Sequence, residues 1–357
     1  MNIPKLDIGG LVASVPIIQG AMGVGVSGAS LAGAVAGQGG VGVIAGVGIG
    51  YREHDFFKNT LKANLRAMGN EIQKARGLAP KGILGVNLMV AMNNYAEMVK
   101  GAVEDGIDLI ISGAGLPTKL PELVQGFKTR IAPIVSSSKA ANIILKYWAS
   151  HYGRTADMVV VEGSLAGGHL GFTEETLKNP DRPLLIDIIR DVLESIQPYE
   201  KLFNRRIPVI AAGGVYTGRD IAEQMAAGAA GVQMATRFVT TRECDAADAF
   251  KQAYLDAKQE DIIIIKSPVG MPGRALDNAF IRKVAETGDT IKGCYQCLRG
   301  CNPKVAPYCI AAALIHSVQG NMDDGLVFVG SNAYRSDRIT GVRELMDELK
   351  EDLKEAL

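Results

Sequence analysis

A glycine-rich segment with a single histidine is the first place in this sequence where chemistry is expected. The apolar run 158–161 is typical of a buried strand, and Glu162 ends it. Gly167, Gly168 and His169 follow in the next loop. Because glycine has no Cβ, such a loop can lie close to a bound molecule. The imidazole can exchange a proton near neutral pH, so His169 is a candidate general base. The alternative is an ordinary turn that carries a surface histidine.

Two later loops have the composition of a phosphate site. The apolar runs 208–211 and 231–234 are followed by Gly213 and Gly214 in one case and by Thr236 in the other. Glycine N–H groups, a hydroxyl group and the start of a helix can together surround an anion. Barrels of parallel strands often bind phosphate with the loops after strands seven and eight. The alternative is a tight turn beside an ordinary helix start.

A third glycine loop resembles a dinucleotide fingerprint. Gly23, Gly25 and Gly28 have the G-x-G-x-x-G spacing, and they lie between a predicted strand and a predicted helix. That fingerprint also needs an acidic residue at the end of the second strand, to bind a ribose. The run 41–45 has no acidic residue at its end, and the first acidic residue after the run is Glu53. A loop laid against a flat cofactor at the top of a barrel strand explains the same glycines.

The elements that must position these loops alternate regularly. Short apolar runs are each followed by a stretch of helical character, over about 220 residues. The runs are 15–19, 41–45, 83–89, 108–111, 132–136, 158–161, 208–211 and 231–234. This rhythm predicts parallel strands with crossover helices, and eight such units fit an α/β fold of the TIM (β/α)8 barrel type. The competing architecture is a doubly wound open sheet.

The pattern changes after residue 235. We predict a barrel core at 1–235, an appended and mostly helical subdomain at 236–332, and a C-terminal helix at 333–357 that packs back on the barrel. The subdomain contains a Pro/Gly-rich stretch, 267–278, and a cysteine-rich segment.

Composition narrows the classes of function. Of 357 residues, 47% are hydrophobic and 21% charged, as in a globular protein, and the formal net charge is zero. No basic surface for nucleic acid is therefore expected. The sequence shows no signal peptide and no run of about 18 apolar residues, so we expect a cytoplasmic protein without a membrane span.

Taken together, several motifs resemble the nitronate monooxygenase (2-nitropropane dioxygenase) family, which includes the FMN-dependent enoyl-acyl-carrier-protein reductases. The matching segments are PIIQGAMG at 16–23, GVNLM at 85–89, EGSLAGGHLG at 162–171, PVIAAGGV at 208–215, VQMATRF at 232–238, PGRALDNAFIRK at 272–283 and GLVFVGSNAYR at 325–335. The resemblance implies a TIM barrel that holds FMN at the C-terminal ends of its strands. Ser164-Leu165 replaces an expected Glu-Ala pair, and ATRF replaces the usual GTRF.

The resemblance also implies roles for individual residues. His169 corresponds to the family's active-site histidine, which takes the α-proton of the substrate or positions a nitronate. The residues implied to surround FMN are Ala21, Met22 and Gly23 against the flavin, Asn87 and Gly168 near it, and Gly213, Gly214, Gln233, Ala235 and Thr236 around its phosphate.

The implied activity is oxidation of alkyl nitronates by O2. The first alternative is an NAD(P)H-dependent enoyl-acyl-carrier-protein reductase, or another NAD(P)H:flavin oxidoreductase on the same fold. The expected partners are a small-molecule substrate, NAD(P)H in the alternative, and a second copy in a homodimer. Other classes are a flavin-binding protein without turnover and a non-flavin barrel, for which Glu162 is the best strand-end carboxylate.

Four clustered cysteines are absent from typical members of the family. Cys294, Cys297, Cys301 and Cys309 have the spacing C-x2-C-x3-C-x7-C, which can bind zinc or an iron–sulfur cluster. An iron–sulfur cluster could pass electrons to a flavin, whereas zinc would hold the segment together. The alternative is that these are free cysteines in helical packing.

Overall fold

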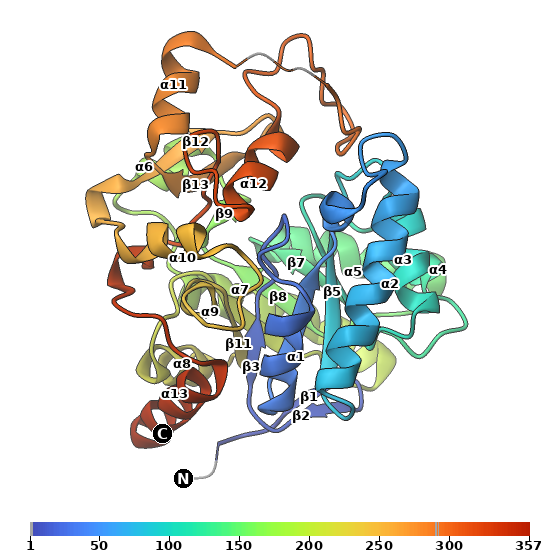
Figure 1. Ribbon diagram of the computed structural model, residues 1–357. Helices are drawn as coiled ribbons and strands as arrows, with labels where there is room; N and C mark the ends of the chain where they lie inside the picture. The colour runs from blue at the N-terminus through green and yellow to red at the C-terminus, as the bar shows by residue number, and fades with distance from the viewer. Residues whose placement is uncertain (1–2, 290, 292) are drawn as a thin grey trace.

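Eight parallel strands close into a barrel in the computed structural model, which describes residues 3–289, 291 and 293–357 (Figure 1). The strands are β3 (Ile17–Gln19), β4 (Val41–Ala45), β5 (Ile83–Met89), β6 (Leu109–Gly113), β7 (Arg130–Val135), β8 (Val159–Glu162), β10 (Val209–Ala212) and β11 (Gly231–Met234). They are paired in that order, and β11 returns to β3. The predicted TIM barrel is therefore confirmed, and the open sheet is excluded.

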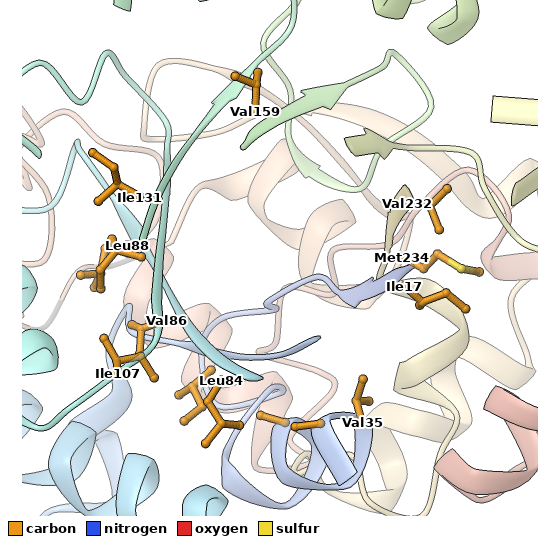
Figure 2. Packing of buried hydrophobic residues seen from close by; sticks show 14 of the residues in the cluster. Ile17, Val35, Leu84, Val86, Leu88, Ile107, Ile131, Val159, Val232 and Met234 are labelled. Carbon is orange, nitrogen blue, oxygen red and sulfur yellow. The ribbon is translucent and has the colours of Figure 1, made fainter. Parts of the chain in front are cut away.

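The barrel strands other than β11 have apolar side chains on both of their faces. On β8, Val160 belongs to the cluster inside the barrel, while Val159 and Val161 belong to the cluster between the strands and the surrounding helices. Figure 2 shows part of this outer cluster, in which Leu84, Val86 and other side chains come from several strands. Successive side chains of a strand point to opposite faces, so burial on both faces explains the continuous apolar runs in the sequence.

A short hairpin lies at the N-terminal end of the barrel. Strands β1 (Leu6–Ile8) and β2 (Leu11–Ala13) pair antiparallel. Leu6, Ile8 and Ala13 pack into the cluster inside the barrel. The hairpin therefore covers the apolar interior at this end, opposite the end where the strand-to-helix loops lie.

Helices surround the barrel. They are α1 (Ala29–Gly37), α2 (Thr60–Leu78), α3 (Tyr95–Glu104), α4 (Leu120–Leu123), α5 (Ser138–Tyr152), α7 (Leu185–Phe203), α8 (Gly218–Ala226) and α13 (Val342–Ala356). The short helix α6 (Glu174–Lys178) lies apart from them, and its Leu177 shares an apolar cluster with Leu170 and Ile264 (Figure 1).

The last of the surrounding helices, α13, packs against α8 and α1. Leu345, Leu349 and Leu353 bury its apolar face, and an ion pair of 2.8 Å joins its Glu348 to Arg237. The C-terminal helix therefore takes the position of the eighth outer helix.

The segment between β11 and α13 covers the C-terminal ends of the barrel strands (Figure 1). Its elements are α9 (Thr236–Val239), α10 (Asp248–Leu255), β12 (Ile262–Lys266), β13 (Pro272–Leu276), α11 (Ala279–Thr287) and α12 (Ile310–Val318). Within the Pro/Gly-rich stretch 267–278, residues 272–276 form β13. This strand pairs with β12 on one side and with β9 (Gly168–His169) on the other. The histidine loop of the barrel is thus held in a small sheet by the appended segment.

Among the described residues, no helix combines the length and apolar character that a crossing of a lipid bilayer requires.

Candidate active site

A cavity of about 470 Å³ lies where the appended segment covers the strand ends. Its walls come from the loops after the barrel strands and from β9, α10 and α12. In parallel barrels the C-terminal face carries the active site, so this position is the expected one.

The structure brings the residues of the predicted site to this one cavity. His169 lines it, as do the ten residues implied to surround FMN: Ala21, Met22, Gly23, Asn87, Gly168, Gly213, Gly214, Gln233, Ala235 and Thr236. They come from five different strand ends, and in the sequence they extend over more than half of the chain. Their placement gives a common site, while the role of each residue stays a prediction.

The paired glycines after β10 leave space that other residues would fill. Gly213 and Gly214 have φ values of +94° and +87°, which side chains rarely adopt. A Cβ on Gly213 would lie 2.9 Å from the backbone nitrogen of Ala166, and one on Gly214 would lie 3.0 Å from Leu165. Only glycine therefore lets these two loops come together at the cavity wall.

The sequence motifs did not identify all the residues of this wall. Gly330, Ser331 and Asn332, which precede α13, also line the cavity. The Asn332 amide donates a hydrogen bond of 2.8 Å to the carbonyl oxygen of Gly214. A Cβ on Gly330 would lie 2.5 Å from Oγ1 of Thr236, so the two segments are in close contact. Residues 330–332 belong to the family-like segment 325–335, which is the signal for them in the sequence, although it predicted no role for them at the site.

His169 is held from several sides. Its backbone is in register with Gly273 in β13, and its Nε2 shares a hydrogen bond of 2.7 Å with Oγ of Ser267. The ring of Phe328 lies edge-on, with its centroid 4.9 Å away. Burial lowers the pKa of His169 to about 4. The imidazole is therefore neutral at physiological pH and can accept a proton. Sequence reasoning missed Ser267 and Phe328, which are distant in the chain.

A buried arginine secures the glycine–histidine loop. Arg274 is opposite Gly168 in the β13–β9 register, and its guanidinium group donates a hydrogen bond to the carbonyl oxygen of Ala166. The residue is 7% exposed, and burial lowers its pKa to about 10. Arg274 therefore fixes the backbone just before Gly168 and His169.

Glu162 is the acidic side chain of the cavity. It is the last residue of β8, is paired with Ala212 of β10, and lines the same cavity as His169. Burial raises the pKa of its carboxyl group to about 7. At neutral pH a large fraction of the molecules therefore carry Glu162 in its protonated form.

The expectation of a metal site at the four cysteines is not supported by the structure. In the described part of the chain, no group of three or more His, Cys, Asp or Glu side chains is arranged to hold a metal ion. Cys294, Cys297, Cys301 and Cys309 are free thiols, and Cys297 and Cys301 pack against an apolar cluster under α12. Burial, together with the neighbouring thiols, raises the pKa of Cys297 to about 12. The packing alternative therefore describes this segment better.

Comparison with known proteins points to one family. The family model described as nitronate monooxygenase matches residues 8–352. A probable nitronate monooxygenase of Staphylococcus saprophyticus is 28% identical over 205 residues, which cover 57% of this chain and 53% of that protein. The matched region is thus about half the length of that relative. The (3aS,4S,5R,7aS)-5-hydroxy-7a-methyl-1-oxo-octahydro-1H-indene-4-carboxyl-CoA dehydrogenase of Mycobacterium tuberculosis is 30% identical, over 80% of this chain and 69% of its own.

Solved structures show the same likeness. FabK from Thermotoga maritima superposes with a TM-score of 0.73 at 27% identity, and the alignment covers 95% of this chain and 93% of that one. A nitroalkane oxidase from Streptomyces ansochromogenes gives a TM-score of 0.71 at 23% identity, with 96% of each chain covered. At that identity the second comparison supports the fold alone.

Proposed function

Because the chain belongs to the nitronate monooxygenase family, we propose that it is an FMN-dependent oxidoreductase that oxidises alkyl nitronates with O2. The observation that carries the proposal is the convergence of His169 and ten potential cofactor residues on a single cavity at the barrel's C-terminal face. The family is one of oxidoreductases, and the identity of the substrate is our inference.

The residues around the cavity fit FMN. The backbone at Gly213 and Gly214 leaves a cradle without side chains, and Gln233 and Thr236 add uncharged donors on the same side. Residues 20–24 offer an apolar wall of small side chains and Met22, suited to a flat ring. FMN, when bound, supplies the transfer of electrons between an organic substrate and O2.

The protein's own contribution is to control protons and water. His169, neutral at physiological pH, takes the α-proton of a nitroalkane or positions a nitronate that has already lost it. Ser267 fixes the orientation of the imidazole, and Phe328 covers one edge of the ring from solvent. Arg274 holds the loop that carries the histidine.

A second candidate is an NAD(P)H-dependent reductase of enoyl thioesters. It is favoured by the likeness to FabK and by the M. tuberculosis relative, whose name specifies a carboxyl-CoA substrate. The cavity also has an apolar side, formed by Met89, Met92, Leu298, Leu314 and Leu326, which suits an acyl chain. A cytoplasmic location and a homodimer belong to both candidates as predictions.

An absorption spectrum of the purified protein tests the proposal first. Bands of oxidised flavin are expected, and under anaerobic conditions a freshly prepared alkyl nitronate should bleach them while NADH does not. Rapid bleaching by NADH alone would instead favour the reductase. A protein that is colourless and takes up no FMN on reconstitution would overturn the cofactor assignment.

A further inference from the structure

The cavity contains an acidic group but no basic side chain to neutralise it. Among the residues that the structure describes, its lining includes Glu162 and His169 but no Lys, Arg or Asp. An anion that binds here must therefore be stabilised by hydrogen-bond donors and not by a cation. An ionised Glu162 would oppose such binding, because like charges repel strongly in a poorly solvated site.

Glu162 has no structural task that would explain its position. Its carboxyl group makes no hydrogen bond or ion pair with another described residue. Burial is the sole cause of its raised pKa. A polar group in the interior without a partner costs stability, and such groups usually serve a ligand. Its place at the carboxyl end of β8, beside Ala212, is where barrel enzymes carry functional side chains.

Glu162 and His169 have pKa values in the reverse of the usual order for a carboxyl group and an imidazole. Burial raises the pKa of Glu162 to about 7 and lowers that of His169 to about 4. Between these values the carboxyl group keeps its proton while the imidazole has none. The same cavity therefore presents a neutral acid and a neutral base, and neither repels an anion.

We propose that Glu162 contacts the substrate and, as a neutral carboxyl group, donates a hydrogen bond to an anionic oxygen of it. The oxygen is that of a nitronate in the function proposed above, on which this assignment of the substrate rests. The oxygen of any small substrate with a delocalised negative charge would be bound in the same way. An O–H donor to an anionic oxygen forms one of the stronger hydrogen bonds in proteins, and it adds no charge to the cavity.

Two substitutions separate the hydrogen bond that Glu162 donates from the negative charge that it carries when ionised. Glu162→Gln keeps a donor of similar shape that does not ionise, and Glu162→Leu removes the donor. Glu223→Gln, on the exposed surface of α8, makes the same substitution away from the cavity and is the matched control. The measurement is kcat/KM for an alkyl nitronate from about pH 5 to about pH 9, a range that includes the titration of Glu162.

For the unmodified protein and Glu223→Gln, we expect kcat/KM to fall about tenfold per pH unit above about pH 7, as Glu162 ionises. Glu162→Gln should lose about 3- to 10-fold at low pH and show no alkaline fall, and Glu162→Leu should lose about 100-fold at low pH. An alkaline fall that persists in Glu162→Gln would overturn the proposal.

A second readout distinguishes failure of this assignment from failure of the nitronate function. Binding of butyrate, a carboxylate that does not react, is followed through the flavin absorbance, and protonation of Glu162 is followed by its carboxyl band in the infrared. If nitronates are not oxidised but butyrate binds at least tenfold more tightly at about pH 6 than at about pH 8.5, Glu162 keeps its role and only the proposed reaction fails. Butyrate binding that does not change with pH, or a carboxyl group already ionised at about pH 5, contradicts the role of Glu162.

Discussion

At the scale of single residues, the site depends on side chains that are far apart in the sequence. The local motifs predict His169 and the glycines, because a strand followed by a glycine loop is visible in a short window. Ser267 cannot be predicted in this way, since it meets His169 from 98 positions further along the chain. Phe328 contacts the same ring from yet another segment. Such contacts depend on the tertiary fold and leave no local pattern.

The lowered pKa of His169 leads to a prediction about its role as a base. Because its pKa is lowered to about 4, the neutral base is present above that pH and is lost only as the pH falls through about 4. With a nitroalkane substrate, kcat/KM should therefore stay constant from about pH 6.5 to about pH 5. His169→Asn should reduce this rate by about 10²- to 10⁴-fold.

The same variant separates a base from a positioning residue. With a preformed nitronate, which has no α-proton to lose, His169→Asn should lose less than about tenfold. Equal losses with both substrates would show that His169 only orients the substrate.

Ser267 should act through the histidine. Ser267→Ala removes the 2.7 Å hydrogen bond, so the imidazole loses its fixed orientation, and we expect kcat with a nitroalkane to fall about tenfold. The KM should change little, because the hydroxyl group bonds to His169. Ser150→Ala, on an exposed part of α5, is the control. A change in KM with an unaltered kcat would place Ser267 in substrate binding instead.

At the scale of elements, the barrel strands are well predicted and the small sheet is not. Each barrel strand is an apolar run of three to seven residues that is buried on both faces, and burial produces that composition. β9 has only two residues, Gly168 and His169, and β13 begins with a proline within the Pro/Gly-rich stretch. Their pairing is a consequence of where α10 and β12 place the chain, which no short window contains.

Arg274 connects the two parts of this sheet, so its loss should have a measurable effect on stability. Arg274→Met removes the donor to the Ala166 carbonyl oxygen and leaves that oxygen without its partner in a buried position. We expect the free energy of unfolding in urea to fall by about 1–3 kcal/mol. FMN binding should weaken as well, because Gly168 lies in the same loop.

A matched substitution shows whether this effect comes from burial. Arg282→Met removes an arginine from α11 whose side chain is 63% exposed, and it should change the stability by less than about 0.5 kcal/mol. Equal effects of the two substitutions would mean that the Arg274 contact contributes nothing specific.

At the scale of the whole molecule, the barrel is completed from both ends of the chain. The hairpin of β1 and β2 covers one end of the interior, and α13 supplies the eighth outer helix. The amphipathic pattern of residues 341–357 predicts the helix, since its apolar residues recur with helical spacing. The hairpin was not predicted, because strands of three residues are too short to show a period.

The position of α13 predicts that its core residues stabilise the entire barrel. Leu349 is fully buried in the outer cluster, so Leu349→Ala should lower the free energy of unfolding by about 2–5 kcal/mol in a single cooperative transition. Leu202, at the end of α7, is 67% exposed, and Leu202→Ala should cost less than about 1 kcal/mol. A separate early transition confined to α13 would show that the helix is only loosely attached.

The hydrogen bond between Ser267 and His169 also has a consequence for the newly made chain. The last barrel strand ends at Met234, whereas Ser267 follows β12 and the closing helix α13 comes later still. As the chain is made from its N-terminus, all eight barrel strands are translated before the partner of the histidine. A nascent chain halted between these points would have the glycine loops but an unsupported imidazole. The hydrogen bond that orients His169, and with it the proposed proton transfer, is therefore acquired late in synthesis, after the strands that carry the site.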